Sequence, residues 1–434
     1  MSFLLDDERP QRKTREEYLA GTPVELQSRV GDVLRSPNLL RWIADGIEQL
    51  GVAGEHLLAL TVYLTGTSRL LDHPLAVIVQ GPSSSGKSYV IEKVARLFPE
   101  ESVLMATDIT PNALYYLSAG ELEHRFVIAG ERSRRQNDDT AQATKALREM
   151  ISSGQLAKLL TVSDLDGPKT VLVQQRGPIA YVESTTAAEL FEEDANRCLV
   201  LQPDERPEQT RRILAAAGRK LSGQGADDLR EQRRQEFHCL QRLLVPANVV
   251  IPFSEKLAEL FPKEPLEVRR AFGHVTSMIQ ASALLHQYQR QRDEGGRIVA
   301  QPEDYWLAHF LLKDVLGRSL GHKLADALRR FVVRLRKYTG EHTAKELAHA
   351  MIVSERTVRE HLNALLEQGA IEQTETQRGP IPAKWMIRAD IELHEPDSNP
   401  LPSVKAVCGV DEDTLGLSEM SADWGSADIS GVPF

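Results

Sequence analysis

The sequence predicts an α/β core built on a mostly parallel sheet, with helical segments on either side of it in the chain and a small C-terminal winged helix-turn-helix module. Short β-branched runs alternate with helical patterns between residues 74 and 205. Apolar residues recur at helical spacing in 24–70 and 207–336. Residues 337–390 show two capped helices followed by two short strand patterns.

These patterns divide the chain into five expected segments. They are a helical N-terminal leader (1–73), the α/β core (74–205), a helical lid and connector (206–336), the winged module (337–390) and an acidic disordered tail (391–434). The tail holds nine acidic residues and one lysine, a charge of −8, so the rest of the chain carries −2 of the formal −10. Local basic patches in the folded body can therefore still attract phosphate.

Composition narrows the class of protein further. No apolar run is long enough for a membrane span or a signal peptide, which predicts a cytoplasmic protein. Cys198, Cys239 and Cys408 lie far apart without metal-ligand spacing, and we expect them to be buried free thiols.

A phosphate-binding motif follows the first strand pattern, LAVIVQ, and precedes a helical pattern. It reads Gly81, Pro82, Ser83, Ser84, Ser85, Gly86, Lys87, Ser88. Glycines let backbone amides wrap phosphates, Lys87 neutralises the β- and γ-oxygens, and the Ser88 hydroxyl binds magnesium. ATP and Mg²⁺ are the expected cofactors. The alternative, a merely Gly/Ser-rich loop, does not account for the strand and helix around the motif.

A second strand pattern, HRFVIAG, ends at Gly130 and Glu131. An aspartate that holds the metal's water shell is usual where this chain has Gly130, so Glu131 is the acid expected to orient the attacking water. We expect this strand to lie next to the phosphate-loop strand. The alternative is a surface glutamate at a strand end.

Two further candidates follow. The strand PIAYVEST ends in a polar run in which Ser184 is the candidate sensor of the γ-phosphate. Arg197 stands just before another strand, where it would reach a neighbouring subunit's ATP as an arginine finger. Its alternative is a salt-bridged surface arginine.

Together these motifs resemble the presensor branch of AAA+ ATPases, in particular minichromosome-maintenance (MCM) helicases and the related helicase modules of phages and mobile elements. The resemblance covers roughly residues 74–318. It implies an ATP-hydrolysing ring, expected to be a hexamer, that acts on DNA in replication. ALREMISSGQLAKL (146–159) is similar to the helix that leads into the family's DNA-contacting hairpin, with Lys158 at the position of its lysine.

The resemblance also has departures. Arg269 or Arg270 is placed as a second sensor in the lid, on a looser match. Gly130 replaces the usual aspartate, the family's zinc-bearing N-terminal domain is absent, and the hairpin is expected to be short, from Leu160 to Gln174.

The C-terminal module is expected to bind DNA. Thr343 with Glu346 forms a capping box, and Ser354 caps a second helix that presents Arg356, Thr357 and Arg359 near its start. The strand patterns AIEQTE and AKWMIR would form the wing around Gly379-Pro380. Winged helices also dock proteins, and the basic flank favours DNA: Arg329, Arg330, Arg334, Arg336, Lys337.

Other functions remain open at this point. ATP could switch the assembly of a DNA-bound initiator or regulator that does not unwind DNA, or the chain could be a nucleotide-dependent scaffold. The acidic tail ends in Pro433-Phe434 like the tip of bacterial single-stranded-DNA-binding proteins, which suggests docking of other replication proteins; an undistinguished terminus is the alternative.

Overall fold

A computed structural model describes residues 13–415 except 108, 111, 119, 132–137, 165–166, 188–189, 191–196, 223–226, 264–266, 321–330, 368–369, 376–381 and 389–399. The chain divides into two compact units. Unit 1 comprises Met1–Val315 together with Leu401–Phe434, and unit 2 comprises Leu316–Pro400. Unit 2 is thus an excursion of the chain between two parts of unit 1.

Unit 1 is built on a five-stranded sheet with the order β2-β3-β6-β1-β7. All four strand pairs are parallel. The strands are β1 (Ala76–Gln80), β2 (Val103–Ala106), β3 (Arg125–Glu131), β6 (Ile179–Thr185) and β7 (Leu199–Leu201). The expected parallel α/β core and its four predicted strands are confirmed. Since the strands are parallel, their carboxyl ends all lie at one edge of the sheet.

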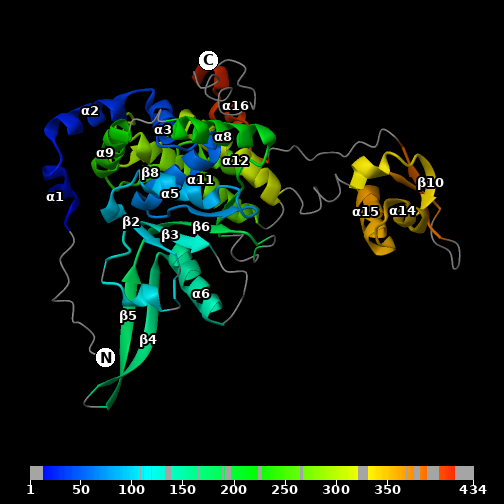
Figure 1. The fold of residues 1–434 in the computed structure, drawn as a ribbon, viewed down its shortest axis with the longest axis horizontal. Helices are drawn as coiled ribbons and strands as arrows, with labels where there is room; N and C mark the ends of the chain where they lie inside the picture. Colours follow the sequence, from blue (N-terminus) through cyan, green and yellow to red (C-terminus); the bar gives the residue numbers. More distant parts are fainter. Residues whose placement is uncertain are drawn as a thin grey trace. The chain divides into compact units, whose positions relative to one another are not determined.

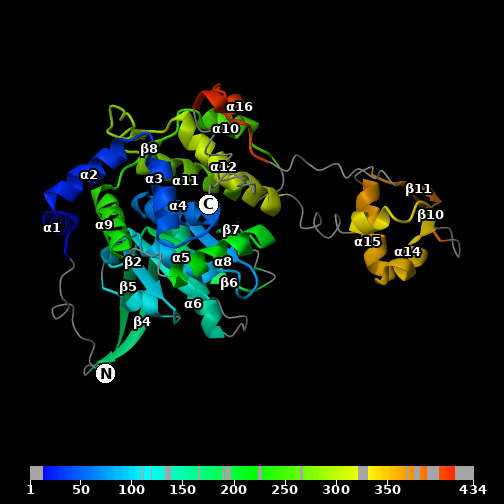
Figure 2. The same ribbon diagram turned by 45° about the horizontal axis from the view of Figure 1, so that its top comes forward.

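Helices surround this sheet (Figures 1 and 2). Those before or between the strands are α1 (Arg15–Ala20), α2 (Val24–Arg35), α3 (Leu39–Gln49), α4 (His56–Thr67), α5 (Lys87–Ala95) and α6 (Asp138–Ser153). Those after β7 are α8 (Pro207–Leu221), α9 (Asp227–Leu243), α10 (Ser254–Leu260), α11 (Val268–Leu285) and α12 (Pro302–Leu320). Two-residue strands β8 (Val249–Val250) and β9 (Ile298–Val299) pair in parallel between these later helices.

The two faces of the sheet are covered by different helices. Helix α4 is apolar all round and buried along most of its length, as a helix enclosed by protein must be. Its Gly66 packs against Phe98 and Phe126, which allows a close approach to β3. On the other face Val127 and Tyr181 pack against Met150 of α6. The helices that were expected to form a leader therefore pack into the same unit as the sheet.

A long hairpin is inserted between α6 and β6. Its strands β4 (Gln155–Asp164) and β5 (Gly167–Arg176) pair over their full length, and the hairpin extends away from the sheet (Figure 1). The sequence-based expectation of a short hairpin from Leu160 to Gln174 is wrong. The pairing continues to the base, where Leu156 and Gln175 face each other and are both buried, Leu156 in the cluster that contains Val127 and Met150.

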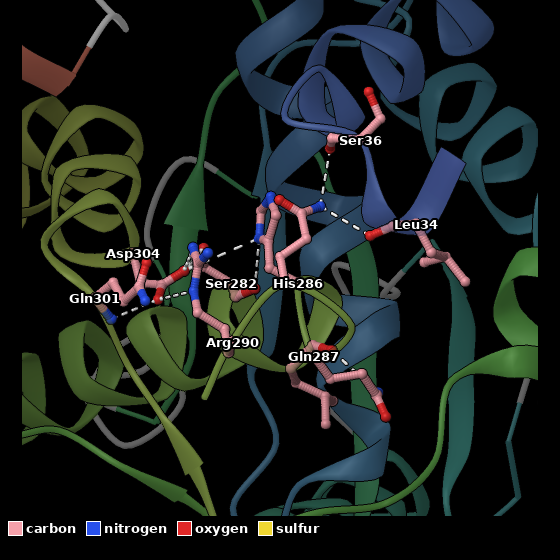
Figure 3. Close-up of polar contacts among 10 residues, drawn as sticks. Leu34, Ser36, Ser282, His286, Gln287, Arg290, Gln301 and Asp304 are labelled. Atoms are coloured by element: carbon pink, nitrogen blue, oxygen red, sulfur yellow. Dashed lines mark hydrogen bonds and ion pairs between the residues drawn. The ribbon is translucent and has the colours of Figure 1, made fainter. Parts of the chain in front are cut away.

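A buried polar cluster fixes α11 to α12 (Figure 3). The Arg290 guanidinium donates two hydrogen bonds to the Asp304 carboxylate, at 2.8 and 2.9 Å. Ser282 Oγ and the backbone amide of Gln301 donate to the same carboxylate at 2.7 and 2.8 Å. The side chains of Arg290 and Asp304 are 7% and 0% exposed, so the pair is largely shielded from water, and both carboxylate oxygens accept hydrogen bonds.

The chain returns to unit 1 after unit 2. Residues 391–434 were expected to be a disordered tail, but Leu401–Leu415 contains α16 (Val404–Cys408) and a short 3-10 helix. Leu401, Val404 and Val407 are buried, and the Tyr305 hydroxyl donates to the Pro402 carbonyl at 2.7 Å. These apolar anchors order a segment whose overall acidity suggested disorder. Pro433-Phe434 lies outside the described residues.

Unit 2 joins helices to a small antiparallel sheet. It contains β10 (Gly340–Thr343), α14 (Ala344–Met351), α15 (Glu355–Glu367), β11 (Glu372–Glu375) and β12 (Lys384–Ile387), with the sheet order β10-β12-β11. The predicted capping box at Thr343 and the cap at Ser354 are confirmed, as is the pairing of the two predicted strands. Strand β10 was not expected. Gly379-Pro380 lies outside the described residues.

Candidate nucleotide site

The candidate phosphate cradle links β1 to α5. Gly86 caps α5 with a left-handed backbone (φ 84°), and Ser84 also has a positive φ of 68°. These conformations turn the chain sharply between strand and helix, and Gly86 adopts its own without steric cost. The result is a loop from Gly81 to Gly86 followed at once by a helix N-terminus, the arrangement in which backbone amides bind phosphate.

The Lys87 side chain is buried and folded over this loop. Its Nζ donates to the carbonyl oxygens of Gly81 at 2.9 Å and Pro82 at 2.6 Å. The loop carbonyls thus accept the hydrogen bonds of the Lys87 ammonium. Phosphate oxygens would accept these bonds when a nucleotide is bound. The residues present therefore fit a triphosphate. Ser88, the expected magnesium ligand, lies in the first turn of α5 and is exposed.

Polar side chains lie along the carboxyl edge of the sheet beside the cradle. Ser184 of β6 is in register with Val79 of β1 on one side and with Glu131 of β3 on the other. Thr186 Oγ1 donates to Glu131 Oε1 at 2.7 Å. Glu131 and Ser184 are therefore brought together next to the phosphate loop.

The strand that carries Glu131 was expected to lie next to the phosphate-loop strand, and this expectation is wrong. Strand β6 lies between β1 and β3. After β3 the chain forms α6 and the hairpin and then returns to the sheet as β6. A strand that comes later in the sequence therefore separates two earlier ones. Spacing along the sequence cannot reveal this order.

Gly130 is required by its surroundings. A Cβ at this position would lie 2.1 Å from the Thr107 carbonyl oxygen. The β3–β6 register also shifts between Ile128 and Glu131, where three residues of β3 oppose two of β6. This bulge puts Glu131, and not Gly130, opposite Ser184.

Arg197 lies far from its own chain's cradle along the strand direction. It precedes Leu199, which pairs with Val77 near the start of β1, and so it sits at the amino edge of the sheet. Its guanidinium donates to the Arg148 carbonyl at 3.1 Å and to Ser152 Oγ, both on α6. The acidic residues next to it in the chain, Glu192, Glu193 and Asp194, lie outside the described residues, so the salt-bridged alternative is not tested.

Three other predicted site residues lie on elements outside the phosphate loop, on the hairpin and on α11. Lys158 is near the base of the hairpin, where its Nζ donates to Asn112 Oδ1 at 2.7 Å and stands 5.3 Å from the centre of the Tyr115 ring. Arg269 and Arg270 are exposed in the first turn of α11.

A second acidic residue near the cradle, Glu55, was not predicted from the sequence. Pro203 packs against Gly81, and the next residue, Asp204, donates its backbone amide to Glu55 Oε1 at 3.0 Å. Burial is the main cause that raises the pKa of the Glu55 carboxyl to about 7. No motif surrounds Glu55, and its burial depends on a loop 149 residues further along the chain.

In unit 2 the three predicted DNA-contacting residues lie in the first turns of α15. Arg356 is highly exposed and pairs with Glu360 at 2.9 Å, and Arg359 pairs with Glu355 at 2.7 Å. The Thr357 amide is capped by Ser354 Oγ at 3.1 Å. Of the basic flank, Arg334, Arg336 and Lys337 are exposed, whereas Arg329 and Arg330 lie outside the described residues.

A comparison with known protein families supports the assignment of residues 81–88 as a phosphate-binding loop. A family model described as the MTBMA_p00010 P-loop domain matches residues 26–236. The chain contains a P-loop domain. The match begins within α2 and ends within α9, so it covers α3 and α4 together with the whole sheet, whereas α1 lies before it. A comparison with curated proteins found no match.

A P-loop domain of this kind indicates a nucleotide-binding NTPase. The described part of the chain holds no cluster of three or more His, Cys, Asp or Glu side chains arranged for a metal ion. Within the same residues, none of the helices has the length and apolar character needed to cross a lipid bilayer.

Proposed function

We propose that this chain is a DNA-dependent ATPase of the presensor, MCM-like branch of AAA+ proteins, and that it moves along or opens DNA during replication. The position of β6 carries the proposal. This strand brings Ser184 and Thr186 between the phosphate loop and Glu131, so that a polar strand end can sense the γ-phosphate while an acid beside it holds water. The hairpin inserted immediately before β6 supports the presensor assignment.

In this proposal each residue of the cradle has a distinct role. Backbone amides from Gly81 to Gly86 wrap the phosphates, and Lys87 exchanges its loop carbonyls for β- and γ-oxygens. Magnesium held by the Ser88 hydroxyl would neutralise charge on the phosphates. Glu131, fixed by its hydrogen bond from Thr186, orients a water for direct attack on the γ-phosphorus.

The catalytic site is completed by a second copy of the chain. Arg197 lies at the amino edge of the sheet and cannot serve the cradle at the carboxyl edge of its own subunit. Its guanidinium is held by α6 through Arg148 and Ser152, and exchange of these contacts for a neighbour's γ-phosphate would stabilise transition-state charge. A closed ring, proposed as a hexamer, provides one such pair per subunit.

DNA contacts are proposed in both units. The hairpin presents Lys158 and carries the exposed Lys169 further out. Unit 2 has the element order of a winged helix, in which α15 enters the major groove with Arg356, Thr357 and Arg359. The acidic C-terminus is proposed as a docking segment for other replication proteins.

One observation favours a second function, an ATP-switched replication initiator or regulator without unwinding activity. The Lys158 ammonium is bound by Asn112 and lies over Tyr115, so it is engaged within its own subunit. In that case ATP controls assembly while unit 2 reads a defined site.

ATPase activity with and without single-stranded and forked DNA tests the main proposal. We expect DNA to stimulate hydrolysis by the wild type and Lys87→Ala to abolish it, because the substitution removes the charge on the β- and γ-oxygens. Displacement of a labelled strand from the fork separates the two functions: unwinding supports the motor, and site-specific binding without unwinding supports the initiator. ATPase activity that DNA leaves unchanged would contradict the main proposal.

A further inference from the structure

Ile352 has a backbone and an exposure that packing does not explain. It ends α14 in a left-handed conformation, φ 55° and ψ 51°, with 91% of the residue exposed. A β-branched residue is a steric outlier in this conformation, which Gly and Asn adopt at lower cost. The exposed side chain gains nothing from burial in unit 2.

Neighbouring side chains hold this turn in place. The Arg334 guanidinium donates to the Met351 carbonyl, and the Tyr338 hydroxyl donates to the Ala350 carbonyl at 3.1 Å. The Val353 amide donates to the Ala348 carbonyl at 3.1 Å. A strained backbone persists where its surroundings determine it in this way. The backbone of the turn is consequently held, and the Ile352 side chain extends from it into solvent.

The same turn leads directly into α15. Ser354 caps that helix, so Ile352 stands two residues before its N-terminal cap. Arg356 and Arg359, one and two turns further on, are bound to exposed glutamates of their own helix and can exchange them for other acceptors. An exposed aliphatic side chain on this turn therefore precedes two exposed arginines of α15, by four and seven residues.

We propose that Ile352 is a base-contacting residue that packs on the 5-methyl group of thymine in the major groove, next to base or phosphate contacts of the α15 arginines. The major-groove edge of a T·A pair is distinguished by this methyl group, and guanine O6 and N7 on a nearby pair accept from arginine. The inference rests on the proposed DNA binding of unit 2 and adds to it a preference for thymine next to the arginine-contacted bases.

Replacement of thymine by deoxyuridine removes the methyl group and leaves base pairing intact. The full-length chain would be titrated with a mixed-sequence duplex and with its deoxyuridine counterpart. We expect the wild type to bind the deoxyuridine duplex about fourfold more weakly, the effect of losing one buried methyl group. Ile352→Gly should bind both duplexes equally, at the wild type's deoxyuridine affinity. Val333→Ala, which shortens another exposed aliphatic side chain of unit 2, should keep the wild-type difference.

Thermal unfolding separates this role from a structural one. Ile352→Gly should melt at the same or a higher temperature than the wild type, since glycine relieves the left-handed strain. Ile352→Asn gives the same readout if the glycine variant fails to fold. Equal binding of the two duplexes by the wild type, or an undiminished difference in the variants, would overturn the inference while leaving DNA binding intact. A wild type that binds neither duplex would overturn the proposed function itself.

Discussion

Gly130 and Thr107 approach so closely that a side chain has no room between them. The nearest atom to a Cβ at 130 would be the Thr107 carbonyl oxygen, at 2.1 Å, and this atom belongs to backbone that cannot rotate away. The missing aspartate of the β3 motif is therefore a consequence of how β2 and β3 continue beyond their paired residues. Glu131, moved into register with Ser184 by the bulge, is the acid that this edge of the sheet presents.

Gly130→Ala should destabilise the protein by about 2–4 kcal/mol, because the backbone of Thr107 must shift to admit the Cβ. Gly218→Ala is the matched control, since a Cβ there meets nothing within 4 Å and alanine favours a helix. Urea unfolding of both variants measures the difference. An equal stability of Gly130→Ala and the wild type would show that the approach to Thr107 is not close.

Asp304→Asn should cost about 3–5 kcal/mol in the free energy of unfolding. The substitution leaves the Arg290 guanidinium buried beside a neutral amide, and an uncompensated buried charge is expensive. Glu259→Gln, which breaks an exposed pair with Lys256, should change stability by less than about 1 kcal/mol. Similar losses in the two variants would mean that the Arg290–Asp304 pair is not shielded from water.

Glu55 should make stability depend on pH near neutrality. Its pKa in the folded chain is about 7, above the ordinary 4.5, so the folded state holds the proton more tightly than the unfolded state. The free energy of unfolding therefore falls as pH rises between these two values, by at most roughly 3 kcal/mol. Below pH 4.5 Glu55 is protonated in both states, so its contribution to stability is fully present and no longer changes with pH.

Glu55→Gln should flatten this dependence and stabilise the protein at pH 8, because the amide oxygen can still accept from the Asp204 backbone. Glu205→Gln, an exposed carboxyl of the same loop, serves as the control and should leave the slope unchanged. Denaturant unfolding at several pH values between 5 and 8 gives the slopes. Parallel curves for Glu55→Gln and the wild type would contradict a buried, protonated Glu55.

The sequence predicted the elements of the site better than their arrangement. Residues 81–88 could be recognised because strand, glycine turn and helix follow one another within a few residues. The order of the sheet could not, since β6 enters between β1 and β3 only after the α6–hairpin insertion. Local patterns specify local structure, whereas strand order depends on contacts between distant segments.

The same limit applies to individual residues. Glu55 carries no motif, and its pKa is set by burial under the loop after β7. The acidity of residues 391–434 suggested disorder. This composition is an average over the whole segment, and it hides the short apolar stretch at its start. Leu401, Val404 and Val407 are enough to dock its first part on unit 1. In unit 2, where helix caps and strands are close in sequence, the prediction missed one short strand, β10.

Mixing two inactive variants tests the shared site most directly. Lys87→Ala should lack activity because its cradle cannot hold the phosphates, and Arg197→Ala because its neighbours' sites lack their arginine. In mixed assemblies an intact cradle of the second variant can meet an intact Arg197 of the first. We predict that ATPase activity measured with DNA returns on mixing, to a fraction of the wild-type rate. No recovery in assemblies that contain both variants, or full activity of Arg197→Ala alone, would contradict the account.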